Sequence, residues 1–134
     1  SVQQVVSAAE EARPAFAGYA TPEATLQSLI WALNIADQKR FEAGCTSEEA
    51  ERFRNRMAGK SEEQFKSEAI ETAKMFAKYR INKREVISET EVHLHLEALG
   101  VDDAKQKGDG KPIMKMKKIG NQWKYAGDRR SQRN

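Results

Sequence analysis

The chain has 134 residues, a mass of 15.1 kDa and a formal net charge of +3, with 39% hydrophobic and 32% charged residues. This size fits one domain with its own core, and the low glycine and proline content excludes a long low-complexity tract. No apolar stretch approaches the roughly 20 residues that a membrane span needs, and the first residues do not resemble a signal peptide.

The first 20 residues mix small apolar side chains with a break at Pro14, followed by Phe16 and Tyr19. This pattern predicts a short helix and then an ordered linker. Thr21-Pro22 is a stronger signal, because threonine caps helix N-termini and proline is tolerated at the first helical position. We therefore expect a helix over about residues 22–36.

That helix is apolar on two sides. One stripe has the spacing of a buried face: Leu26, Leu29, Ile30 and Leu33. Ala24, Trp31 and Ile35 gather on the other side. Such a helix needs two covers, of which the sheet is one and either the N-terminal segment or a second chain is the other. Trp31 and Ile35 are therefore candidates for an interaction surface.

Two further helix starts have the sequence of a capping box, Thr46-Ser47-Glu48-Glu49 and Ser61-Glu62-Glu63-Gln64. They predict helices over about 47–58 and 61–78. On the first of these, Arg52, Arg54 and Arg56 do not converge, because alternate helical residues lie about 200° apart. We interpret the three arginines as a solvated surface with acidic neighbours and not as an anion clamp.

After Tyr79 the hydrophobic period changes from helical to alternating. Residues 79–88 and 91–98 are predicted strands, with Val92, Leu94 and Leu96 pointing inward and a bulge at Val86-Ile87. A polar loop over 100–111 precedes a third strand through Met114 and Met116. Gly120-Asn121 then predicts a hairpin to a fourth strand with Trp123 and Tyr125. The sequence thus predicts an α+β fold, with helices leading and an antiparallel sheet of about four strands closing the chain.

The proline-started helix from Thr21 to Leu33, followed by Asp37, resembles the opening helix of nuclear transport factor 2-like domains. The segment Met116-Lys117-Lys118-Ile119-Gly120-Asn121-Gln122-Trp123-Lys124-Tyr125 is similar to the last hairpin of the same superfamily. The resemblance implies a cone-shaped α+β roll of the cystatin-like kind, with a curved sheet wrapped around helices and a pocket between them. It covers residues 21–127 and leaves 1–20 as an N-terminal segment and 128–134 as a basic tail.

The resemblance implies where a ligand would bind. The pocket candidates are mostly apolar: Leu33, Phe76, Tyr79, Leu94, Met114, Met116, Trp123 and Tyr125. Enzymes of the superfamily place carboxylates, histidine or tyrosine in the pocket, whereas the inward positions here are almost all apolar. No catalytic residue and no cofactor is therefore predicted.

Three polar residues of the second strand, His93, His95 and Glu97, share one face at a spacing of two. They are weak candidates for metal ligands, and a solvent-facing polar strand is the simpler interpretation. Lys115, Lys117 and Lys124 should lie on the same outer face. A nucleic-acid role is disfavoured, because Trp123 and Tyr125 point inward and leave no aromatic residues among those cations. Cys45 precedes a helix cap and has no histidine near it in sequence, so we interpret it as a small structural residue.

The leading hypothesis is a non-catalytic accessory domain that binds a small apolar ligand or a protein partner and belongs to a larger bacterial protein. One alternative is a small isomerase- or cyclase-like enzyme with Tyr79, Tyr125 or Asp37 as its polar groups. Another is an interaction module of a regulatory or envelope assembly, and a homodimer stays open as well. Neither the bacterial cytoplasm nor the cell envelope is favoured as the location.

Overall fold

The computed structural model describes residues 15–100 and 110–131. Its helices are α2 (Pro22–Asn34), α3 (Gln38–Ala43), α4 (Ser47–Met57) and α5 (Glu62–Phe76). The strands β1 (Tyr79–Ser88), β2 (Glu91–Ala98), β3 (Pro112–Ile119) and β4 (Gln122–Arg130) form one antiparallel sheet in the order β1-β2-β3-β4. The predicted α+β fold is confirmed. The predicted helix within residues 1–20 and most of the 100–111 loop lie outside the described residues.

The predicted helix starts are those of the structure. Thr21, Thr46 and Ser61 are the N-caps of α2, α4 and α5, and Ser61 with Gln64 forms a complete capping box. All three helices end one or two residues before the predicted positions. The short helix α3 was not predicted, because six residues are too few for a hydrophobic period to show.

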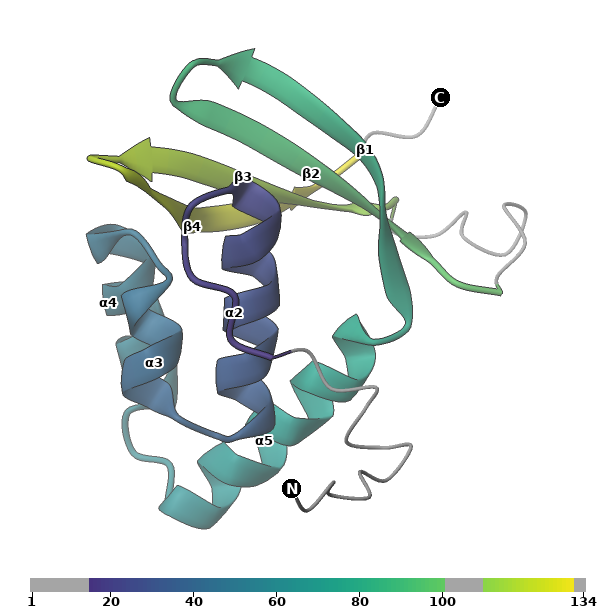
Figure 1. Ribbon diagram of the computed structural model, residues 1–134. Coiled ribbons are helices and arrows are strands. Elements are labelled where there is room, and N and C mark those ends of the chain that lie inside the picture. The colour runs from purple at the N-terminus through teal and green to yellow at the C-terminus, as the bar shows by residue number, and fades with distance from the viewer. Residues whose placement is uncertain (1–14, 101–109, 132–134) are drawn as a thin grey trace, which may run out of the picture.

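The helices lie on one face of a curved sheet, which we call the inner face (Figure 1). In that view α2 lies against the sheet, with α3 and α4 on one side of it and α5 on the other. The predicted inward strand residues are all buried on this face: Val92, Leu94, Leu96, Met114, Met116, Trp123 and Tyr125. Since burial of each large apolar side chain contributes about 1.5–3 kcal/mol, this layer is a main source of the fold's stability.

The outer face of the sheet differs from the solvated surface that the sequence predicted. Lys115 lies opposite His93, and Lys117 pairs with both Glu91 and Lys124, so the predicted cations do share this face. His93, however, is buried, with 7% of its surface exposed. Its Nδ1 lies 3.2 Å from Arg129 Nη2, and its Nε2 lies 2.7 Å from Glu91. Long neighbouring side chains thus cover a residue that alternation alone places in water.

The last strand is longer than predicted. Asp128, Arg129 and Arg130 belong to β4 and not to a basic tail. Met114 pairs with Asp128 and Met116 with Tyr125, so β4 uses three steps where β3 uses two. The extra residue is a β-bulge, and Gly127 adopts a φ of +107° there, a value that favours glycine. The bulge turns Asp128 to the inner face.

The two edges of the sheet are treated differently. At β4, the backbone N–H of Trp123 donates to Tyr19 O and that of Tyr125 donates to Gly44 O, both at 2.8 Å. The carbonyl of Trp123 accepts from the buried Thr25 hydroxyl at 2.7 Å. At β1, the backbone of the described chain pairs only with β2, and the register slips twice, once at the predicted Val86-Ile87 bulge. Among the residues that the structure describes, one edge is therefore covered and the other is open.

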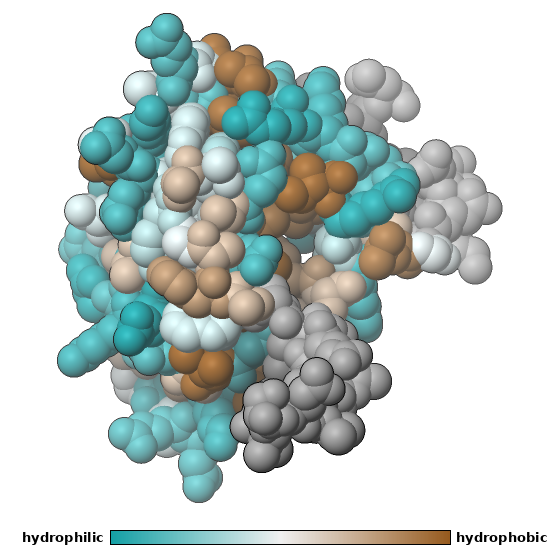
Figure 2. Space-filling model, in the orientation of Figure 1, coloured by the Kyte–Doolittle hydropathy of each residue, from teal (hydrophilic) through white to brown (hydrophobic). Residues whose placement is uncertain are grey.

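The second apolar side of α2 is partly covered from within the chain. Phe16 packs on Trp31 with ring centroids 5.1 Å apart, and the guanidinium of Arg40 lies 5.8 Å from the Trp31 ring. Ile35 stays half exposed. On the face drawn in Figure 2, apolar residues form separate groups among hydrophilic ones. This side of α2 therefore has less apolar surface to offer a partner than its sequence predicts.

Candidate functional site

A cavity of about 300 Å³ lies between the helices and the inner face of the sheet. We call it the helix–sheet cavity. Its walls come from α2, α4, α5, β3 and β4, with one residue from α3. The apolar lining residues are Leu26, Leu29, Ile30, Leu33, Phe41, Phe53, Met57, Phe65, Ala69, Met75, Phe76 and Met114, and the polar ones are Arg56, Glu68, Thr72, Tyr125 and Asp128.

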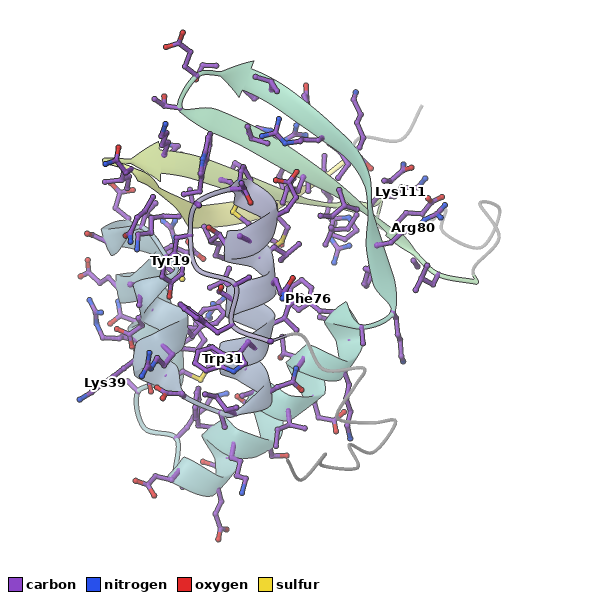
Figure 3. All side chains as sticks on the ribbon, viewed as in Figure 1. Tyr19, Trp31, Lys39, Phe76, Arg80 and Lys111 are labelled. Carbon is purple, nitrogen blue, oxygen red and sulfur yellow. The ribbon has the colours of Figure 1, made fainter. Side chains whose placement is uncertain are left out.

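The spacing of residues along the helices explains the apolar walls. The buried stripe of α2 supplies one wall, and Phe53 and Met57 of α4 lie one turn apart on another. Small residues of α5 leave the space open, because Ala69 lies where a larger side chain would enter the cavity. Figure 3 shows Phe76 between α5 and α2, below the sheet. The cavity is thus a gap in the core that these residue sizes leave unfilled.

Four of the eight predicted pocket residues line the helix–sheet cavity, namely Leu33, Phe76, Met114 and Tyr125. The others lie elsewhere. Leu94, Met116 and Trp123 are packed within the core, and Tyr79 is half buried at its edge. The curvature of the sheet decides this division, because only part of the inner face lies opposite the open space.

Tyr125 is the buried polar residue of the cavity. Its hydroxyl donates to Asp128 Oδ1 at 3.1 Å, and burial, followed by the charges of Asp128 and Glu49, raises the pKa of this tyrosine. The phenol therefore keeps its proton at neutral pH and acts as a hydrogen-bond donor. Asp128 itself is exposed. The pair is a fixed polar point at the rim of an otherwise apolar space.

The three arginines of α4 have three different surroundings. Arg52 pairs with Glu49 at 2.6 Å, and Arg54 pairs with Glu42 at 2.5 Å. Arg56 instead lines the cavity, and its guanidinium lies 5.8 Å from the ring centroid of Phe53. All three arginines are exposed, as a solvated surface requires, but Arg56 also lines the cavity, which the sequence interpretation did not include. The signal that would have found it is its spacing of three residues from the inward-facing Phe53.

Glu68, Thr72 and Asp128 are the other polar cavity residues that sequence reasoning missed. Both carboxylate oxygens of Glu68 accept hydrogen bonds from Lys60 Nζ, each at 2.6 Å. The Thr72 hydroxyl donates to the backbone carbonyl of Glu68 at 2.8 Å. Both lie on the polar border of an amphipathic helix, where periodicity does not say whether a side chain faces a cavity. For Asp128 the signal was Gly127, because a glycine inside a strand pattern often marks a bulge.

The remaining candidates do not meet at one site. His93 and His95 contact different carboxylates, Glu91 and Glu85, while Glu97 pairs with Arg80. Across residues 15–100 and 110–131, no three His, Cys, Asp or Glu side chains are grouped so that they could hold a metal ion. Asp37 caps α3 and lies outside the cavity lining, as does Tyr79. Of the three polar residues named for the enzyme alternative, Tyr125 lines the cavity and the other two do not.

Cys45 lies in the core behind the cavity. Its thiol donates to the Phe41 carbonyl at 3.3 Å, and residue 45 forms an isolated bridge with Tyr125. Burial raises the pKa of this thiol to about 12, and Glu49 and Glu42 add to the effect. The thiol thus stays protonated at neutral pH, and the helix cap that follows it does not activate it.

No family model matches this chain, and neither a curated protein nor a solved structure is significantly similar to it. Among the helices that the structure describes, none combines the length and the apolar character needed to cross a bilayer.

Proposed function

We propose that this chain is a non-catalytic binding domain of the nuclear transport factor 2-like type, and that it holds a small apolar ligand in the helix–sheet cavity. The single observation that carries the proposal is the cavity of about 300 Å³ with mostly apolar walls. Cavities of this size and lining are typical of small-molecule sites. At about 30 Å³ for each water-sized group, it has room for about ten non-hydrogen atoms.

The arrangement around the cavity supports the family part of the proposal. The proline-started helix lies under the sheet, and Trp123 of the last hairpin is buried where the resemblance expects a tryptophan to close the core. The chain enters the sheet through α5 and β1, and the strands follow as a simple meander. The proposal rests on this match of pattern and position.

The polar groups of the cavity support binding more than catalysis. A general base that works near neutral pH needs a free proton acceptor of suitable pKa, most often histidine or a desolvated carboxylate. Both histidines of the sequence lie on the outer face of the sheet. Tyr125 holds its proton, and Asp128 is exposed and already accepts the hydrogen bond from that tyrosine. These groups can orient a ligand.

The test is to fill the cavity. Replacing Ala69 with phenylalanine places a ring in the open space, whereas Ala77→Phe adds the same ring at an exposed position just after α5. We expect wild type and Ala77→Phe to bind the uncharged fluorescent probe N-phenyl-1-naphthylamine, and Ala69→Phe to lose at least tenfold in affinity.

Circular dichroism would check that Ala69→Phe is folded. Thr72→Phe, at a half-buried lining position, is a second filling variant if Ala69→Phe fails that check. Equal probe binding by wild type and a folded filling variant would reject the cavity as the binding site.

The hydrogen-bonded pair Tyr125–Asp128 favours one alternative, the isomerase- or cyclase-like enzyme. Such chemistry begins with removal of a proton beside a carbonyl group. In heavy water, the enzyme alternative expects an apolar cyclic ketone to gain deuterium at those carbons, and expects both Tyr125→Phe and Asp128→Asn to slow the exchange. The binding-domain proposal expects no exchange above the buffer rate, which mass spectrometry of the recovered ketone measures.

A further inference from the structure

We infer that the ligand of the helix–sheet cavity is a small apolar carboxylic acid, whose carboxylate is bound by Arg56 and whose hydrocarbon part fills the cavity. This inference rests on the proposed function and specifies the ligand's chemistry. It follows from the charges that line the cavity, most of which already have partners within the chain.

Arg56 lies at the rim of the helix–sheet cavity. It lines the cavity from α4, and its guanidinium lies over the ring of Phe53, which is itself a wall residue. This cation–π contact uses no hydrogen bond, so the N–H donors of the guanidinium stay available. The cation therefore sits at the border between the apolar space and water, where the head group of an amphipathic ligand would lie.

Arg56 has no carboxylate partner among the described residues. The preceding arginines of α4 do, since Arg52 pairs with Glu49 and Arg54 with Glu42. An arginine donates up to five hydrogen bonds in a planar fork that matches the two oxygens of a carboxylate. Arg56 is thus the lining cation whose donors are not committed to an acid of the described chain.

The cavity lining also contains two acidic residues, Glu68 and Asp128. Glu68 is paired with Lys60 through both carboxylate oxygens, so its charge is balanced within the chain. Asp128 accepts a hydrogen bond from the Tyr125 hydroxyl, which satisfies part of its bonding capacity. Neither acid can bind an anionic ligand. Because Glu68 is paired with Lys60, it competes less with a ligand carboxylate for Arg56 than an unpaired acid would. With Glu68 paired, Arg56 and Asp128 are the two lining charges that a ligand head group could meet, and of these Asp128 already accepts a hydrogen bond.

The apolar residues of the lining indicate that the rest of the ligand is hydrocarbon. Leu33, Phe65 and Met114 line the space from three different elements, and all three have apolar side chains. Each methylene group buried in this space adds to the binding free energy, so the chain length governs affinity. With room for about ten non-hydrogen atoms, a medium-chain fatty acid such as octanoic acid is a suitable probe.

The experiment compares three probes with the same alkyl chain, octanoate, octanol and octylamine, by their displacement of N-phenyl-1-naphthylamine. We expect octanoate to displace the dye from the wild-type protein at about five- to tenfold lower concentration than octanol. Arg56→Gln should remove this preference, so that octanoate and octanol displace the dye at similar concentrations. Lys39→Gln is the charge-matched control, because Lys39 lies on α3 and points away from the cavity (Figure 3).

Arg56→Lys should keep part of the preference, since a lysine retains the charge but loses the bidentate geometry. Equal binding of octanoate and octanol by wild type, or an equal loss of both probes in Arg56→Gln, would overturn the inference. Tighter binding of octylamine would also overturn it and would assign the head group to Asp128. Failure of the dye to bind at all would instead count against the proposed function, so the two ideas fail in different ways.

Discussion

The two edges of the sheet show how differently this fold treats its ends. Three segments outside the sheet bond to the backbone of β4, at Tyr19, at Thr25 and at residues 44–46. Along β1 most residues are exposed, including Val86 with 62% of its surface in water. The cavity and its polar rim belong to the covered side. The candidate ligand site therefore lies on the side where the helices contact the sheet.

The open edge has features that discourage pairing with another strand. β1 contains Arg80, Lys83 and Arg84 and two register shifts, and both charge and irregularity protect exposed edges from association. Arg84 also pairs with Glu23 at the start of α2, at 2.8 Å. Strand β1 thus completes the sheet, whereas β4 connects the sheet to the helices and to the cavity.

The largest expected contrast is in stability. Trp123→Ala removes a buried ring from the covered strand and should lower the free energy of unfolding by about 3–5 kcal/mol. Val86→Ala on β1 should cost about 0.5 kcal/mol or less, because its side chain is mostly exposed. Urea unfolding of both variants measures the difference. Similar losses would show that the open edge is packed more tightly than the structure indicates.

The second contrast is in thiol reactivity. Since burial raises the pKa of Cys45 from 9.0 to about 12, its thiolate fraction near pH 8 should fall about a thousandfold. We expect Ellman's reagent to react at least a hundredfold more slowly with the native protein than with protein in urea. A Val86→Cys, Cys45→Ala variant should react quickly in the native state. Rapid native labelling of Cys45 would mean that the covered edge opens often.

The raised pKa of Cys45 also predicts an alkaline effect. The unfolded chain releases this proton near pH 9, while the folded chain holds it until about pH 12. The unfolded state therefore binds fewer protons over this range, and the stability from this group is lost as pH rises through it. Thermal unfolding above pH 9 should show a smaller decline for Cys45→Ala than for wild type.

A third contrast concerns single polar contacts at each edge. Thr25→Val keeps the side-chain shape but leaves the buried Trp123 carbonyl without its side-chain donor, which should cost about 1–3 kcal/mol. Arg84→Gln breaks the exposed ion pair with Glu23 and should cost about 0.5 kcal/mol or less. Equal costs in chemical unfolding would contradict the division into a covered and an open edge.

The smallest expected effect is the acid response of β1. A hydrogen bond with His95, 2.8 Å away, is the main cause that lowers the pKa of Glu85 below its ordinary 4.5. This carboxylate stabilises the folded state above pH 4.5, and the contribution is lost as pH falls through the lowered pKa. Glu85→Gln should flatten the acid side of the stability curve slightly. A steeper curve for the variant would show that Glu85 is not stabilising.

Much of the fold could be predicted because its signals are local. The caps at Thr21, Thr46 and Ser61 and the alternation at residues 91–98 depend only on neighbours in sequence, and the structure has helices and strands there. Helix α3 could not be predicted from periodicity, since it is too short. For the site, parity predicted that Met114 and Tyr125 face inward, and both line the cavity.

The rest of the site depends on three-dimensional arrangement. Asp128 reaches the cavity only because the bulge at Gly127 reverses the alternation, and Arg56 lines it only because α4 packs with Phe53 toward α5. His93 is buried by side chains from β2 and β4 that the sequence does not place together. In each case the deciding contact joins residues that are distant in sequence or depends on a single local irregularity.

The sequence alone predicted the order of the helices and strands apart from α3, and the apolar side of β2, β3 and the first half of β4, because capping and hydrophobic period act over a few residues. Only the tertiary structure decided that the core leaves an open space, that Tyr125 and Asp128 meet at its rim, and that Arg56 faces it without an acidic partner in the described chain. The cavity depends on the sizes and directions of side chains from six different elements, which no single segment of the sequence contains.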